Sequence, residues 1–145
     1  MQVFERPATR RFLYGFWALR QRMVRHAGPA MKRLHGLDLG DFFLLDVVAR
    51  EQLSPTEIAR HLELPAPVIS RRVEALERQA LIARALDPND ARRHVLSLTA
   101  AGRTRLTEAA TTVERETESF LDILDPPSLS TFLDALETLA EDRTP

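Results

Sequence analysis

Apolar side chains recur at helical spacing in the first third of the chain. In the segment 8–27 they are spaced four, three and four residues apart, as on one helix face: Phe12, Phe16, Leu19 and Met23. Leu13 and Trp17 widen this stripe, so more than one surface has to cover it. We expect Gly28-Pro29 to stop or break the helix. A second helix is predicted over 38–50, and its largely apolar surface favours a central position.

Residues 54–80 contain two predicted helices separated by a short turn. Ser54 is a favourable N-cap, Pro55 suits the first helical position, and Glu57 completes a capping box. A turn follows over 64–67, and Pro67 can open the next helix. The inner face of this second helix has apolar residues at spacings of four, three and four: Ile69, Val73, Leu76 and Ala80. Its outer face is polar and bears arginine, so the segment describes a helix-turn-helix.

A hairpin and two more helices are predicted after the helix-turn-helix. Strands over 81–86 and 94–98 flank the charged segment 87–93, which forms the hairpin tip. Thr99 caps a long helix whose narrow apolar seam is spaced alternately four and three residues: Leu106, Ala110, Val113, Thr117, Phe120 and Leu124. Such a seam fits the packing of one helix on another, within the chain or between subunits. We expect Pro126-Pro127 to end this helix and Ser128 to cap a last amphipathic helix.

Length and composition indicate one globular domain over 1–145. The chain has 145 residues, of which 44% are hydrophobic and 28% charged. No apolar run reaches the roughly 18 residues that cross a bilayer, and the N-terminal segment lacks the apolar region of a signal peptide. We therefore expect a cytoplasmic protein with no membrane partner. The lack of cysteine excludes disulfides, thiolate metal sites and cysteine nucleophiles.

The net charge of −1 hides a strong asymmetry along the chain. Lys and Arg exceed Asp and Glu by four over residues 1–53 and by three over 54–105, whereas acidic residues exceed them by eight over 106–145. A basic body with an acidic C-terminal segment favours DNA contact through the body.

The order of helix, helix-turn-helix and hairpin is that of a winged helix, and its chemistry suits double-stranded DNA. A helix fits the major groove, while a two-stranded wing reaches the neighbouring backbone or minor groove. The predicted DNA-binding residues lie on the second helix and at the hairpin tip: Pro67, Val68, Ser70, Arg71, Arg72, Arg92 and Arg93. Asp87 and Asp90 are expected to shape the tip by bonds from their side chains to the backbone.

Three stretches resemble the MarR family of bacterial winged-helix regulators. They are "LSPTEIARHL", "VEALERQALIAR" and "DPNDARRHVLSLTAAG", the last of which fits the family's D-P-x-D-x-R wing. The resemblance implies a winged helix-turn-helix core over 38–98 and dimerisation helices over 8–27 and 99–140. The expected fold is mainly α with a small β-wing.

The resemblance also implies a homodimer, pseudo-palindromic DNA and a small phenolic or other aromatic effector. The corresponding function is a sequence-specific transcriptional regulator, a repressor that the effector releases. Tyr14 and Trp17 are candidates for lining the effector pocket. The chain departs from the family at Ala80, where glycine is usual, and at Pro65 and Pro67, which remove hydrogen-bond donors from the helix start.

Two other function classes are open to the sequence. A winged-helix dimer that has lost DNA readout could serve as a protein-interaction or ligand-binding module, and Pro65 and Pro67 favour that alternative. An enzyme is not expected, because no catalytic motif or nucleotide loop is present. We expect no cofactor and no metal, since the four histidines are scattered: His26, His35, His61 and His94.

Overall fold

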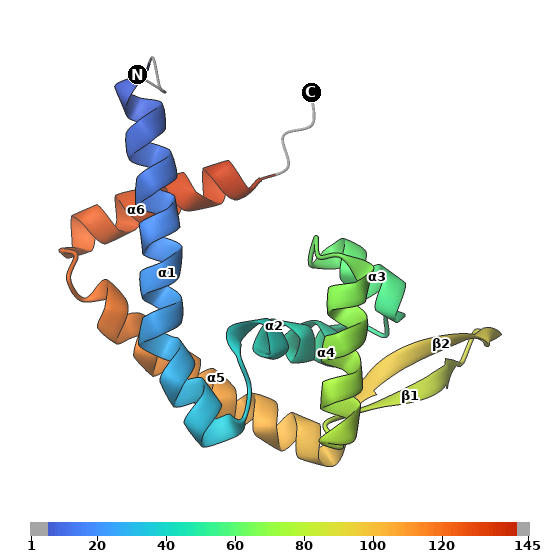
Figure 1. The fold of residues 1–145 in the computed structure, drawn as a ribbon. Helices are drawn as coiled ribbons and strands as arrows, with labels where there is room; N and C mark the ends of the chain where they lie inside the picture. Colours follow the sequence, from blue (N-terminus) through green and yellow to red (C-terminus); the bar gives the residue numbers. More distant parts are fainter. Residues whose placement is uncertain (1–5, 142–145) are drawn as a thin grey trace.

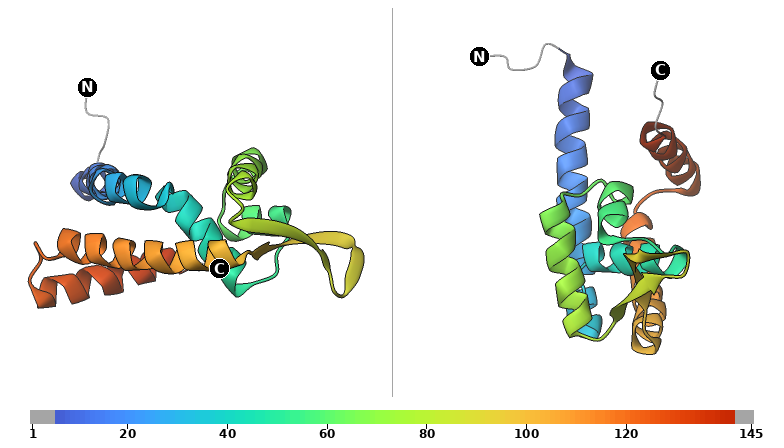
Figure 2. Two further views of the ribbon diagram at one scale, coloured as in Figure 1. Left: turned by 90° about the horizontal axis from the view of Figure 1, so that it is seen from below. Right: turned by 90° about the vertical axis from the view of Figure 1, so that its right-hand side faces the viewer.

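The computed structural model describes residues 6–141, which form a helical arm and a smaller lobe that carries a hairpin (Figure 1). In chain order the elements are α1 (Pro7–His35), α2 (Leu39–Arg50), α3 (Pro55–His61), α4 (Ala66–Arg78), β1 (Ile82–Asp87), β2 (Asp90–Leu98), α5 (Ala100–Leu121) and α6 (Pro126–Ala140). The arm consists of α1, α5 and α6, whereas α2–α4 and the hairpin form the lobe (Figure 2). Helix α5 joins the two parts, because it packs against α1 as well as α2 and β2.

Helix α1 is longer than its sequence predicts. The expected stop at Gly28-Pro29 is wrong, since the helix continues through Pro29 to His35. Its last three turns bury Ala27, Ala30 and Met31, and this packing outweighs the local penalty of an internal proline. The helix ends instead at Gly36, which adopts the left-handed conformation with φ of 69°.

The starts of α2 and α3 follow local capping signals. Asp38 and Asp41 form a capping box at α2, and Ser54 and Glu57 form the predicted one at α3. Both helices place apolar side chains in the shared core, including the fully buried Leu44, Leu45 and Ile58. The predicted helices over 38–50 and 54–61 are therefore confirmed.

Helix α4 has the predicted inner face but a different end. Ile69, Val73 and Leu76 are fully buried. Ala80, predicted on the same face, is exposed beyond the helix end, with φ of 56°. It occupies the left-handed turn position that closes a helix, and Leu81 N–H donates to Leu76 O at 3.0 Å. The turn that glycine usually forms is thus made here by alanine.

The hairpin is more regular than predicted. Its antiparallel register runs from Ile82 opposite Leu98 to Asp87 opposite Asp90, with an irregularity between Leu86 and Asp87. The strands extend to Asp87 and Asp90, so the connection is only Pro88-Asn89. Arg92 and Arg93 therefore lie in β2 and not in an irregular tip, which corrects the predicted strand limits.

The C-terminal helices differ from prediction at their junction. Thr99 caps α5 as expected, accepting a hydrogen bond from Gly102 N–H at 2.9 Å. However, α5 ends at Leu121, so Leu124 lies outside it, and Pro126-Pro127 begins α6 instead of ending α5. The N-cap of α6 is Asp125 and not Ser128. Proline is favourable in the first turn of a helix, where its missing N–H has no intrahelical role.

The core lies where α2, α3, α4 and the hairpin base meet α5 and the end of α1. By contrast, α6 has no buried residue, and the N-terminal half of α1 exposes a series of large apolar side chains: Phe12, Leu13, Tyr14, Phe16 and Trp17. Within residues 6–141, no helix is long and apolar enough to cross a membrane.

Candidate nucleic-acid interface

The outer face of α4 presents polar and cationic groups from its first two turns. Ser70 and Arg71 are exposed, Pro67 is exposed beside them, and Val68 is half-buried. Arg71 Nε donates to Pro67 O at 3.2 Å, which directs the guanidinium along the helix towards its N-terminus. The side chain remains able to donate from its two terminal nitrogens. This face therefore offers cationic and hydroxyl donors on a regular helix.

Arg72 does not share that outer face. Its Nη1 donates at 2.7 Å to Asp38 and at 2.7 Å to Asp41, and its side chain is only 26% exposed. Partial burial lowers the pKa of Arg72, but the hydrogen bonds to Asp41 and Asp38 outweigh that effect and hold the pKa above its ordinary value. Sequence reasoning missed these partners, because Asp38 and Asp41 lie more than thirty positions away in the chain and have a local role as helix caps.

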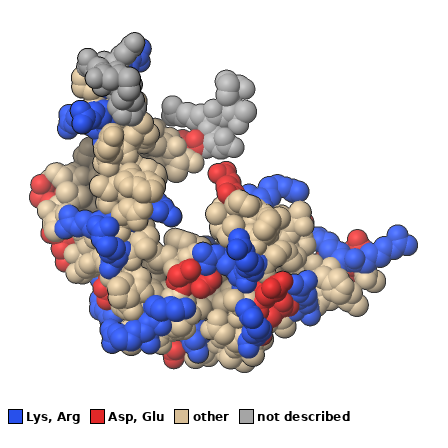
Figure 3. All heavy atoms as spheres, viewed as in Figure 1, with Lys and Arg blue, Asp and Glu red and all other residues tan. Residues whose placement is uncertain are grey.

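Arg92 lies in β2 near the far end of the hairpin and is exposed. Its backbone N–H donates to Asp90 Oδ1 at 3.0 Å, and Asn89 N–H donates to Asp87 Oδ1 at 2.8 Å. The two aspartates thus hold the short connection by bonds from side chain to backbone. No carboxylate within residues 6–141 forms an ion pair with Arg92. Figure 3 shows blue arginine side chains at this end of the hairpin.

Arg93, the next residue, is fixed by two carboxylates. Its guanidinium donates to Glu57 at the start of α3 and, at 3.1 Å, to Asp87 of β1. The pKa of Glu57 is lowered to about 2 by the Ser54 backbone N–H, the Ser54 hydroxyl and Arg93. Glu57 therefore has two functions, since it caps α3 and anchors the hairpin to that helix.

The candidate effector residues lie on the arm. Tyr14 and Trp17 are 62% and 61% exposed. Neither lines the apolar pocket of about 320 Å³ between α1, α5 and α6, which is bounded by Leu19, Arg22, Phe120 and Phe132 among others. The α1 residues that line this pocket begin at Ala18, directly after Trp17, and the Arg22 guanidinium lies 5.7 Å from the centre of the Phe120 ring.

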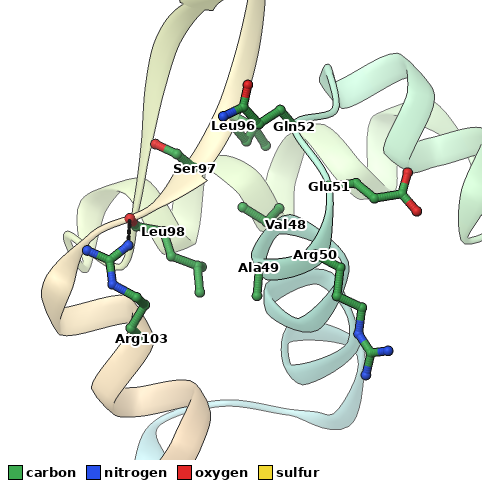
Figure 4. A pocket seen from close by; sticks show the side chains of 9 residues that line it. All are labelled: Val48, Ala49, Arg50, Glu51, Gln52, Leu96, Ser97, Leu98 and Arg103. Atoms are coloured by element: carbon green, nitrogen blue, oxygen red, sulfur yellow. Dashed lines mark hydrogen bonds between the residues drawn. The ribbon is translucent and has the colours of Figure 1, made fainter.

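A second pocket, of about 300 Å³, lies between the end of α2, β2 and the start of α5 (Figure 4). Arg103 Nη1 donates to Leu98 O at 3.0 Å, whereas Arg50 and Glu51 point away from the hollow. Charged groups therefore do not converge in this pocket as they would in a site for an ionic ligand. Residues 6–141 contain no group of three or more His, Cys, Asp and Glu side chains placed to hold a metal ion.

The sequence and fold are similar to those of known regulators. Residues 35–93 match the MarR family model, whereas no curated protein is significantly similar in sequence. The transcriptional repressor CouR, bound to a 23-mer DNA duplex, is 24% identical with a TM-score of 0.83, covering 97% of this chain and 100% of that chain. The Mycobacterium tuberculosis MarR family protein Rv2887, in complex with DNA, is 25% identical with a TM-score of 0.72 over 88% of this chain and 96% of that chain. The S. aureus MepR–DNA complex is 21% identical with a TM-score of 0.76, covering 88% and 95% of the two chains.

The similarity extends from the helix-turn-helix to the arm. The family match includes α2, α3, α4, β1 and the first part of β2, while the structural matches cover most of the chain. The predicted mainly α fold with a β-wing is thereby confirmed. Several matched structures are named as transcriptional repressors or regulators. Residues 35–93 of this chain are therefore similar in sequence to the MarR family, and the chain has the fold of the matched MarR and CouR structures.

Proposed function

We propose that this protein is a transcriptional regulator that binds pseudo-palindromic double-stranded DNA as a homodimer. Helix α4 enters the major groove, and the hairpin reaches the adjacent minor groove or backbone. The structures of CouR, Rv2887 and MepR, which contain DNA, support this function. The winged-helix core is assigned to residues 38–98, and the dimerisation region to α1, α5 and α6.

One observation carries the proposal. Arg71 on α4 and Arg92 on β2 are both exposed, and within residues 6–141 neither forms an ion pair with a carboxylate. Helix α4 packs against β1, so both arginines belong to the same lobe. Exposed arginines on a helix and on a wing match the two grooves that a winged helix contacts. Ser70, Pro67 and Val68 complete the α4 face, with the last two suited to apolar contact with thymine methyl groups.

The homodimer is proposed from the exposed apolar surface of the arm. On α1, Phe12 and Phe16 stack with their ring centres 6.1 Å apart while remaining 55% and 54% exposed. On α6, Leu133, Leu136 and Leu139 are exposed as well. Exposed large apolar side chains on both helices favour burial of this surface against another subunit. In such a dimer two α4 helices would lie about one DNA turn, roughly 34 Å, apart.

The regulatory part of the proposal is repression that a small aromatic ligand relieves. Tyr14 and Trp17 lie on α1, where the second subunit would complete a site. The ligand acts only if it binds the DNA-free arrangement more tightly than the DNA-bound one.

Binding to the DNA upstream of the protein's own coding region tests the function directly. Fluorescence anisotropy at 50 and 200 mM salt should show affinity falling by at least roughly 10-fold, because phosphate contacts release counterions. The same titration with a scrambled duplex measures specificity. Equal affinity at both salt concentrations, or no binding to any duplex, would reject DNA recognition.

A second candidate is a winged-helix dimer that acts as a protein-interaction or ligand-binding module. Pro65 occupies the N-cap of α4 without a capping bond from its side chain, and Pro67 lies in the first turn. These residues remove two backbone donors from the end of α4 that approaches phosphate. A stable protein complex that is insensitive to salt, together with no DNA binding, would favour this candidate.

A further inference from the structure

We infer that Arg72 is a positioning residue that fixes the rotation of α4, and thereby the direction of Arg71, without contacting DNA itself. The inference rests on the proposed DNA binding and adds a division of roles between adjacent arginines. We refer to Arg72 with Asp38 and Asp41 as the α2–α4 clamp.

The clamp joins two elements through a single guanidinium nitrogen. Arg72 Nη1 lies 2.7 Å from Asp38 Oδ1 and 2.7 Å from Asp41 Oδ1. The same carboxylates cap α2, since Asp41 N–H donates to Asp38 at 2.8 Å and Asp38 N–H donates to Asp41 at 3.1 Å. Arg72 therefore binds two carboxylates that the capping box of α2 also holds in place.

Gly40 leaves the space that the Arg72 guanidinium occupies beside α2. A Cβ atom at Gly40 would lie 2.6 Å from Arg72 Cζ and 2.6 Å from Nη2, well inside normal contact distance. The guanidinium thus lies directly against the backbone of α2. A side chain at position 40 would therefore require the end of Arg72 to shift from its present position.

The clamp holds α4 in the rotation that its buried face, Ile69, Val73 and Leu76, already favours. Successive residues on an α-helix are about 100° apart around its axis, so holding Arg72 towards α2 turns Arg71 towards solvent. Helix α4 packs mainly against α3 and β1, and the clamp ties its middle to the start of α2. Because α2 follows α1 after only three residues, the clamp also links α4 to the end of the arm.

The test compares Gly40→Ala, Arg72→Gln and Arg71→Ala in DNA binding, with Gly28→Ala as the control. Gly40→Ala changes no charge, and Gly28 is a helical glycine with open space around its Cβ position. We expect Gly40→Ala and Arg72→Gln each to weaken specific binding at least about 10-fold while leaving the slope of log K against log salt unchanged. Arg71→Ala should reduce that slope by about one phosphate contact, and Gly28→Ala should bind like wild type.

Two outcomes overturn the inference. A reduced salt slope for Arg72→Gln with normal binding by Gly40→Ala would make Arg72 a phosphate contact. Normal binding by both variants would make the clamp irrelevant to DNA.

Denaturant unfolding of Arg72→Gln, Asp41→Asn and the double variant gives a readout that needs no DNA. We expect the double variant to be destabilised less than the two single variants together, and strict additivity contradicts the clamp. If the two substitutions are non-additive but wild type binds no DNA, the clamp is supported as a structural contact. That result would reject the proposed function and the DNA-positioning role of Arg72.

Discussion

Glu57 and Arg93, which are 36 residues apart, form an ion pair that attaches β2 to the first turn of α3. Arg93 also reaches Asp87 at 3.1 Å, so it is held from both its own hairpin and the neighbouring helix. Arg92 belongs to the same strand but points to the other side, because successive strand residues alternate. Two adjacent arginines in β2 therefore have different surroundings, one anchored and one exposed.

The two arginines should respond differently to truncation. We expect Arg92→Ala to weaken operator binding by about 1–3 kcal/mol and to leave the melting temperature unchanged. Arg93→Ala should instead increase hydrogen exchange of the β1–β2 amides, because the hairpin loses its attachment to α3. Anisotropy titrations and exchange mass spectrometry measure the two effects. If both variants lose the same DNA affinity and neither changes the hydrogen exchange of the hairpin amides, the two arginines do not have different roles.

Acid should weaken the contribution of Glu57 to folding. Its pKa lies at about 2 in the folded protein, against an ordinary value of 4.5, because the Ser54 backbone N–H, the Ser54 hydroxyl and Arg93 all favour the carboxylate. A lowered folded-state pKa gives stability that is complete above pH 4.5 and is lost as the pH falls towards 2. We expect the difference in unfolding free energy between wild type and Glu57→Gln to shrink over this range. Denaturant titrations at several pH values check it, and a difference that stays constant would be inconsistent with the ion pair.

Ala80 offers a site where glycine should stabilise the protein. Its φ of 56° lies in the left-handed region, which costs an L-residue roughly 1–2 kcal/mol. We expect Ala80→Gly to raise the free energy of unfolding by about 1 kcal/mol after the entropy of glycine in the unfolded chain is counted. Ala18→Gly, inside α1, is the matched control and should lower it by about 1 kcal/mol. If both substitutions destabilise the protein equally, the turn after α4 is not strained.

Trp17 is the single tryptophan of the chain and reports on the proposed dimer. It is 61% exposed in one chain, so a partner that covers α1 would move it into an apolar environment. We expect its fluorescence emission to shift to longer wavelength when the protein is diluted, in parallel with the loss of dimer in sedimentation experiments. Leu136→Glu on α6 should produce the same shift at high concentration. A spectrum that does not change while the dimer dissociates would place Trp17 outside the interface.

Most of the lobe could be predicted from the sequence because its signals are local. Ser54, Pro55 and Glu57 define the start of α3 within four residues, and Ile69, Val73 and Leu76 define the inner face of α4. The end of α1 could not be predicted in this way. Pro29 is a local break signal, and the helix continues because residues beyond it pack against α5.

The residues of the candidate nucleic-acid interface also differ in whether local sequence predicts their position. The exposure of Arg71 follows from the helical pattern around it. The inward direction of Arg72 does not, because it depends on Asp38 and Asp41, which reach it only once the chain has folded. Likewise, Glu57 has a sufficient local role as a cap, so nothing in the sequence indicates that it also binds Arg93.

Because α1 is one continuous helix, a small tilt at one end produces a larger displacement at the other. Its 29 residues span about 44 Å at roughly 1.5 Å per residue, from the exposed aromatic surface to the turns buried against α5. A rod of that length tilted by about 5° moves its far end by about 4 Å, which exceeds the tolerance of hydrogen bonds to base edges. In the proposed dimer, a small change of angle between the two subunits at the aromatic end would therefore be magnified at the two α4 helices, and their fit to both DNA half-sites would be lost together.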